Sequence, residues 1–268
     1  MRRTFVFLAL AIPLFPQAAT DAHPGLSLEQ KEQFLLKAPI TKTRGAKKGI
    51  TGTVRATLSD GAITHDASIQ RINEEKARFE GIAGTELNFR DTYLFNIAAY
   101  RLGKMLGLGG MIPTSVQRFH EGSTGAWTWW VENVLMDEGE RLKQNTTGPD
   151  KDRWARQTLI MRVFDQLIAN TDRNIGNTLY DKEWRLWMID HTRAFRRHYT
   201  LLNPKMLDKC DRQLLAAMKA LTKDALKAEL GPYVRDVEIT GLLRRRDVIV
   251  QHFEKAGPEK LYDFLPQR

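Results

Sequence analysis

The sequence predicts an α+β protein in which a mainly antiparallel β region comes first and a mainly helical region follows. Two runs suited to strands, residues 49–58 and 62–72, flank the turn sequence Ser59-Asp60-Gly61 and predict a hairpin. Apolar residues at helical spacing predict a helix from Asp152 to Ala169, and further helices follow Pro204. Together these patterns predict a small β lobe and a larger helical lobe.

Three more elements connect the hairpin to the long helix. Asn88 or Asp91 is suited to cap a helix that runs through Leu106 and ends at Gly107. Residues 111–119 and 126–132 then predict two strands.

Composition places the chain among globular proteins, since 42% of its 268 residues are hydrophobic and 27% are charged. The single cysteine, Cys210, excludes an internal disulfide and is expected to be a buried thiol. Six scattered histidines without metal-binding spacing argue against catalytic zinc.

The net charge of +9 favours acidic partners such as nucleotides, acidic proteins or anionic lipid surfaces. The charge is spread along the chain rather than gathered, so no specific nucleic-acid partner is expected. The one tight run, Arg244-Arg245-Arg246, is interpreted as a solvated helix face.

The amino terminus reads as an export signal. Arg2 and Arg3 precede an apolar run at residues 5–15, and small residues around Ala22 offer a cleavage position. We therefore expect residues 1–22 to be a signal peptide and the protein to be periplasmic or extracellular, with an uncleaved anchor as the alternative. Any other contact with a membrane would be peripheral.

The segment from Phe164 to Phe195 carries the candidate chemistry. Its loop contains Asp172 and Asn177, and Asp190 follows the second of two short apolar runs. Asn177 and Asp190 are oxygen ligands suited to Mg²⁺ or Mn²⁺. Asp172 would accept or orient the proton of an incoming hydroxyl, and Arg173 would neutralise phosphate charge. The alternative is a helix end with an Asx turn and a strand-terminal cap, without chemistry.

This segment resembles the atypical branch of the protein-kinase-like superfamily, which includes phosphatidylinositol kinases, HipA-like kinases and the secretory-pathway Golgi casein kinase family. The shared pattern is N-x-D-R-x-x-x-N followed by I-D-x-x-x-A-F. The resemblance implies a two-lobed protein-kinase-like fold that binds ATP and Mg²⁺ or Mn²⁺. It makes Asp172 the catalytic-loop aspartate, Asn177 the metal-binding asparagine and Asp190 the aspartate of the DFG-equivalent position.

The resemblance also implies a domain organisation. After a leader or linker at residues 23–44, residues 45–133 would form the amino-terminal lobe with one αC-type helix, and residues 134–268 the carboxy-terminal lobe. Glu132 would lie in the hinge that pairs with adenine. The phosphate-covering loop would be supplied by residues at the start of the first strand, namely Lys47, Lys48, Gly49 and Gly52.

Two positions depart from the family pattern. Gln70 stands where the family has the nucleotide-binding lysine, and Asn96 stands where it has the glutamate of the αC-type helix. Arg71 points to the other face of the strand and Lys76 is displaced, so neither is an obvious substitute. A neutral pair that is able to hydrogen-bond replaces a charged one.

Three functions stay open from the sequence. The first is an ATP-dependent and Mg-dependent kinase acting on a hydroxyl of an unknown protein, sugar or small molecule. The second is a pseudokinase, a nucleotide-binding or protein-binding module without phosphotransfer. The third is transfer of AMP on the same fold.

Overall fold

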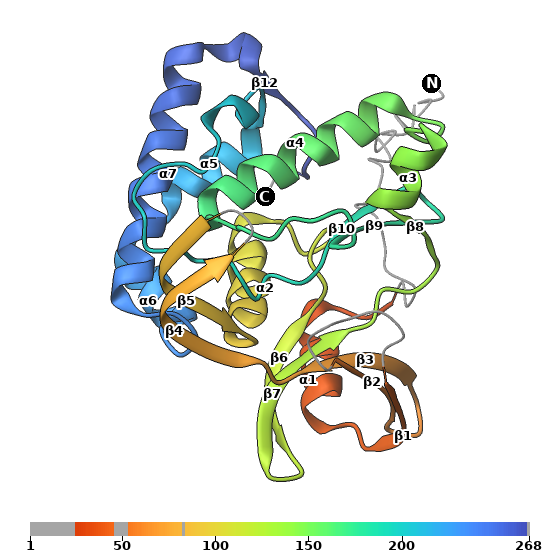
Figure 1. The fold of residues 1–268 in the computed structure, drawn as a ribbon. Helices are drawn as coiled ribbons and strands as arrows, with labels where there is room; N and C mark the ends of the chain where they lie inside the picture. Colours follow the sequence, from red (N-terminus) through yellow and green to blue (C-terminus); the bar gives the residue numbers. More distant parts are fainter. Residues whose placement is uncertain (1–24, 46–52, 82–83, 267–268) are drawn as a thin grey trace, which may run out of the picture.

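The computed structural model describes residues 25–45, 53–81 and 84–266, which form two lobes (Figure 1). The first lobe contains a five-stranded antiparallel sheet in the order β1-β2-β3-β7-β6. Its strands are β1 (Ile40–Gly45), β2 (Val54–Ser59), β3 (Thr64–Gln70), β6 (Ser115–His120) and β7 (Ser123–Trp129).

Helix α1 (Leu28–Lys37) covers this sheet. It begins with a capping box at Ser27 and buries Phe34 and Leu35 against Trp127 and Trp129. Residues 28–44 therefore belong to the amino-terminal lobe, where a leader or linker was expected. The capping box was the sequence signal for this helix.

A separate hairpin, β4 (Asn73–Gly81) and β5 (Gly84–Thr92), follows β3 and leads into α2 (Leu94–Leu106). Asn88 and Asp91 lie within β5, so the expectation that either residue caps the helix was wrong. The residue at the cap position is Tyr93, and the predicted end at Gly107 is confirmed by its left-handed φ of 80°. The hairpin was missed because β4 is exposed along both faces and has no alternation of apolar residues.

The second lobe is mainly helical (Figure 1). Three short antiparallel strands, in the order β10-β9-β8, lie beside the cleft, and a buried core centred on α4 and α7 supports them. Its elements are β8 (Val134–Asp137), α3 (Glu138–Gln144), α4 (Lys151–Ile168), β9 (Thr178–Asp181), β10 (Leu186–Met188), η1 (Pro204–Met206), β11 (Cys210–Asp211), α5 (Arg212–Ala220), α6 (Lys223–Leu230), α7 (Asp236–Ala256), η2 (Pro258–Lys260) and β12 (Leu261–Tyr262).

The basic run on α7 is not a solvated face. Arg245 is fully buried, and its guanidinium donates hydrogen bonds to the backbone oxygens of Leu167 and Arg196. Arg246 likewise donates to the carbonyl of Leu221. These arginines donate hydrogen bonds to carbonyl groups at the ends of neighbouring segments. The pattern of charges along the sequence does not predict such contacts. Cys210 is buried, as expected.

Within the described ranges, no helix has the length and apolarity needed to cross a membrane. The expected signal peptide and the residues expected to form the phosphate-covering loop lie outside the described residues.

Candidate functional site

A cleft of about 1190 Å³ contains most of the residues that the sequence singled out. Its walls come from β3, α2, the segment between β7 and β8, the loop after α4 and the segment after β10. The predicted residues among its lining are Gln70, Asn96, Glu132, Asp172, Asn177 and Asp190. Arg173 is not among them.

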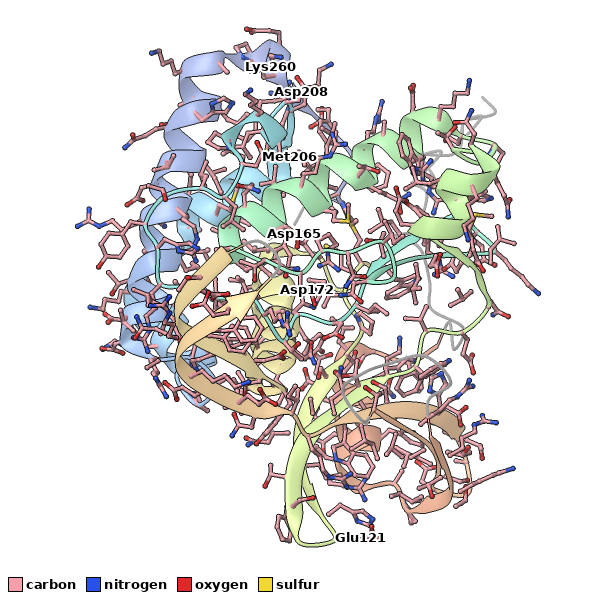
Figure 2. The ribbon with its side chains drawn as sticks, viewed as in Figure 1. Glu121, Asp165, Asp172, Met206, Asp208 and Lys260 are labelled. Atoms are coloured by element: carbon pink, nitrogen blue, oxygen red, sulfur yellow. The ribbon has the colours of Figure 1, made fainter. Side chains whose placement is uncertain are left out.

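The loop that carries Asp172 is fixed by side-chain hydrogen bonds. Helix α4 ends at Ala169, whose φ is 47°, and the Asn170 amide oxygen then accepts the backbone N–H of Asp172 at 3.0 Å. The Asn177 amide Nδ2 donates to the carbonyl oxygen of Asp172 at 2.9 Å. This bond leaves the Asn177 Oδ1 as the oxygen available to a ligand. Figure 2 labels Asp172 near the centre of the molecule.

Arg173 anchors this loop from behind. It forms a bidentate ion pair with Asp165 on α4, with distances of 2.9 and 3.0 Å. Its remaining donors reach the carbonyls of Asn177 and Ile189 and the Nε2 of His191. All five donors of the guanidinium are used. The structure thus gives Arg173 an anchoring role in the loop, and its expected contact with phosphate charge stays a prediction.

His191 is held in its neutral form. Burial lowers the pKa of this histidine well below its ordinary value, and the positive charge of Arg173 adds to the effect. Since Arg173 donates to Nε2, that nitrogen is an acceptor and the proton lies on Nδ1. The neutral ring thereby supports the arginine that anchors the loop after α4.

Asp190 has the features of a metal ligand. It follows β10 with a φ of 51°, and its Oδ1 is buried with no hydrogen-bond partner among the described residues. Burial raises the pKa of this carboxyl, the charges of Asp172 and Asp91 also raise it, and hydrogen bonds from Thr192 oppose the shift. A buried anionic oxygen without a donor fits a cation. The described residues contain no cluster of three His, Cys, Asp or Glu side chains placed to hold a metal. The donor set is thus sparse, as expected for Mg²⁺ that keeps water and phosphate ligands.

Gln70 and Asn96 meet in the cleft. The Asn96 Nδ2 donates to the Gln70 Oε1 at 2.5 Å, and the Asn96 Oδ1 accepts the backbone N–H of His191 at 2.6 Å. Both side chains are buried. Lys76 lies in the exposed β4 and pairs with Glu74, away from the cleft lining. The neutral pair therefore occupies the position inferred from strand alternation; its role toward nucleotide stays a prediction.

The segment between β7 and β8 forms the part of the cleft expected to receive adenine. Val131 and Glu132 line it, and the Glu132 Oε1 lies 3.4 Å from the Nε2 of His65. The Arg55 guanidinium lies over the Trp130 ring at 4.1 Å. The site thus combines flat apolar surface with peptide groups.

Three further residues shape the site and were missed from the sequence. Asp165 is the buried partner of Arg173, and its signal was an acidic residue on the apolar face of α4. Arg193 lines the cleft and pairs with Asp91 through Nε and Oδ2 at 2.7 Å. No local pattern marked that pair, because its members are 102 residues apart.

The solved structures that resemble this chain in fold include the following three. Hydra Fam20 with sugar has a TM-score of 0.63 and 16% identity over 88% of this chain and 92% of that chain. The Golgi casein kinase with Mn/ADP bound gives 0.61 and 12%, over 88% and 78% of the two chains. Another structure of the Golgi casein kinase gives 0.57 and 13%, over 84% and 75%. No family model matches the sequence, and a search of curated proteins gives no match.

The structural likeness confirms the α+β fold with two kinase-like lobes. It extends over both lobes, because more than four-fifths of the chain is covered in each comparison.

Proposed function

We propose that the protein is a phosphotransferase that depends on ATP and Mg²⁺ or Mn²⁺ and acts on a hydroxyl acceptor. The observation that carries the proposal is the meeting of Asp172, Asn177 and Asp190 in one cleft, where the buried Asp190 Oδ1 has no hydrogen-bond partner in the described part of the chain. A structural neighbour that holds Mn and ADP supports the choice of ligands.

Each residue has a role that its contacts support. Asn177 and Asp190 would hold the divalent cation, which neutralises phosphate charge when bound. Asp172 is half-buried at the cleft and would take or orient the proton of the acceptor hydroxyl. Arg193, whose side chain is 37% exposed, replaces Arg173 as the candidate for contact with phosphate.

The main alternative is a pseudokinase. The observation that favours it is the uncharged Gln70–Asn96 pair, because in kinases a lysine at this place contacts the nucleotide phosphates. AMP transfer is a further alternative, since the same cleft would serve a nucleotide bound in the opposite direction. The retained set of Asp172, Asn177 and Asp190 favours phosphotransfer.

Labelled ATP distinguishes these functions. The mature chain, incubated with Mn²⁺ and candidate protein or sugar acceptors, should transfer label from the γ-phosphate and none from the α-phosphate. The structural neighbours, a Golgi casein kinase and Fam20 with sugar, motivate these two acceptor classes. Transfer of α-label would establish AMP transfer. Binding of nucleotide with no transfer in either assay would favour the pseudokinase.

Export remains part of the proposal. An amino-terminal signal at residues 1–22 would place the enzyme outside the cytoplasm, with acceptors in the periplasm, in the secretory pathway or outside the cell. Sequencing the amino terminus of the protein recovered from a secreting host tests this, because cleavage is expected near Ala22.

A further inference from the structure

Asp91 is a third carboxylate in the cleft, beside Asp172 and Asp190. It lies near the end of β5 and is only 3% exposed. Its Oδ2 accepts one hydrogen bond from the Arg193 Nε, at 2.7 Å. Its Oδ1 is buried and has no hydrogen-bond partner among the described residues.

The ion pair with Arg193 does not account for this second oxygen. Arginine and carboxylate often form two parallel hydrogen bonds, whereas here only Nε and Oδ2 meet. Leaving a buried anionic oxygen without a donor is costly, and buried groups of this kind call for a bound partner. The Asp190 Oδ1 is likewise buried and has no hydrogen-bond partner among the described residues.

The balance of charge around the cleft points the same way. Asp91, Asp172 and Asp190 all line the same cleft. Arg193 is the cation paired at this end of the cleft, while Arg173 is taken up by Asp165. Asp91 and Asp190 each leave one buried carboxylate oxygen without a donor among the described residues, which suits a shared divalent cation.

We infer that Asp91 is a further ligand of the divalent cation that Asp190 holds, so that the β4–β5 hairpin supplies part of the metal site. Carboxylate oxygens are the ligands that Mg²⁺ and Mn²⁺ prefer. The inference rests on the proposed function for the nucleotide complex, but binding of the cation alone is measurable without nucleotide.

The hairpin is held firmly enough for this role. Its Arg90 forms a buried ion pair with Glu238 of α7, and its Glu86 pairs with Arg196 at 2.9 Å. The backbone N–H of Thr92 donates to the carbonyl of Thr192 at 3.0 Å. These contacts fix Asp91 relative to the segment after Asp190, as a metal ligand requires.

The test measures Mn²⁺ binding to the full mature chain by the loss of the free-ion electron paramagnetic resonance signal, without nucleotide and with ADP. Asp91→Asn should weaken binding by about tenfold or more. Glu80→Gln is the matched control, since it removes one negative charge from an exposed position of the same hairpin outside the cleft lining, and it should bind like the parent.

Arg193→Gln separates coordination from support of the ion pair. If Asp91 binds the cation, this variant should bind Mn²⁺ at least as tightly as the parent, because a nearby positive charge is removed. Asp91→Cys should lose Mn²⁺ affinity and gain Cd²⁺ affinity, since thiolates prefer softer metals and the native Cys210 is buried.

Several results would overturn the inference. The first is that Asp91→Asn binds Mn²⁺ like the parent. The second is that Arg193→Gln loses as much Mn²⁺ affinity as Asp91→Asn does. The third is that the parent binds no Mn²⁺. If the substitutions unfold the chain, anomalous scattering from Mn²⁺ in crystals of the unaltered protein decides: a peak that contacts Asp190 but not Asp91 contradicts the inference. A chain that binds Mn²⁺ through Asp91 but no nucleotide would overturn only the proposed function.

Discussion

Asn96 accepts a hydrogen bond from the backbone N–H of His191 at 2.6 Å, so helix α2 is tied directly to the residue that follows Asp190. The same side chain donates to Gln70 at 2.5 Å. One amide therefore joins β3, α2 and the segment after β10 without any charge. The Gln70–Asn96 pair stands where the family has a charged pair, and it forms an uncharged link between these elements.

Restoring charge at this link should tighten ATP binding. Gln70→Lys with Asn96→Glu would create an ion pair in the buried part of the cleft, and the glutamate would still accept the His191 N–H. Gln70→Lys alone should help less, because its ammonium would face the donating amide of Asn96. Calorimetry of Mg-ATP binding to the parent, the two single variants and the double variant measures the coupling. Additive effects would show that these positions do not act as a clamp.

Asp172→Ala should keep nucleotide affinity and lose turnover. Asp172 is assigned to the acceptor proton and not to the metal, so its loss acts on the transition state. General-base catalysis contributes roughly 10²- to 10⁴-fold, which sets the expected decrease in the rate of phosphate release from ATP. A parallel loss of Mn-ADP affinity would place Asp172 among the metal ligands instead.

Arg173→Gln should destabilise the protein rather than weaken nucleotide binding directly. The Arg173 and Asp165 side chains are 12% and 10% exposed, so the substitution leaves a largely buried carboxylate unpaired. Breaking such a pair costs roughly 3–5 kcal/mol of the free energy of unfolding, which urea denaturation measures. Arg78→Gln, which breaks the exposed pair with Glu80, is the control and should change little. If Arg173→Gln kept the stability of the parent but bound ATP more weakly, Arg173 would instead be assigned to contact with the nucleotide phosphates.

Asp190 should make the metal-free protein less stable as pH rises. Burial raises the pKa of Asp190 in the folded state above the ordinary value, so the unfolded chain releases this proton first as pH rises. The free energy of unfolding therefore falls between the pKa of the unfolded chain and the raised pKa of the folded protein. Asp190→Asn should therefore be more stable than the parent at neutral pH, with the difference vanishing at about pH 4 and below. Cation affinity should show the reverse trend and be lost as pH falls through the raised value. Thermal denaturation across pH checks the sign, and a variant less stable than the parent at neutral pH would contradict it.

The catalytic segment was predictable because its information is local. The end of α4 at Ala169, the polar loop and the short strands β9 and β10 follow one another within residues 164–195, and turn-forming residues separate them. Strand alternation predicted the face on which Gln70 lies, and the family resemblance placed Asn96 opposite it; the structure contains a hydrogen bond between the two side chains.

Other features depend on contacts between distant segments. The β4–β5 hairpin is charged and exposed. Distant partners hold it in place, such as Arg235 at the start of α7, which pairs with Glu75 at 2.6 Å. Arg245 is buried because carbonyl groups 49 and 78 residues away need donors. Charge patterns along the chain indicate nothing about such pairings.

Calorimetry of nucleotide binding tests the central claim most directly. The protein should bind ATP or ADP only when Mg²⁺ or Mn²⁺ is present. Asp190→Ala should abolish this metal-dependent binding, and the exposed control Glu80→Gln should keep it. A parent that binds no nucleotide at millimolar metal concentrations, or an Asp190→Ala variant that binds like the parent, would contradict the account.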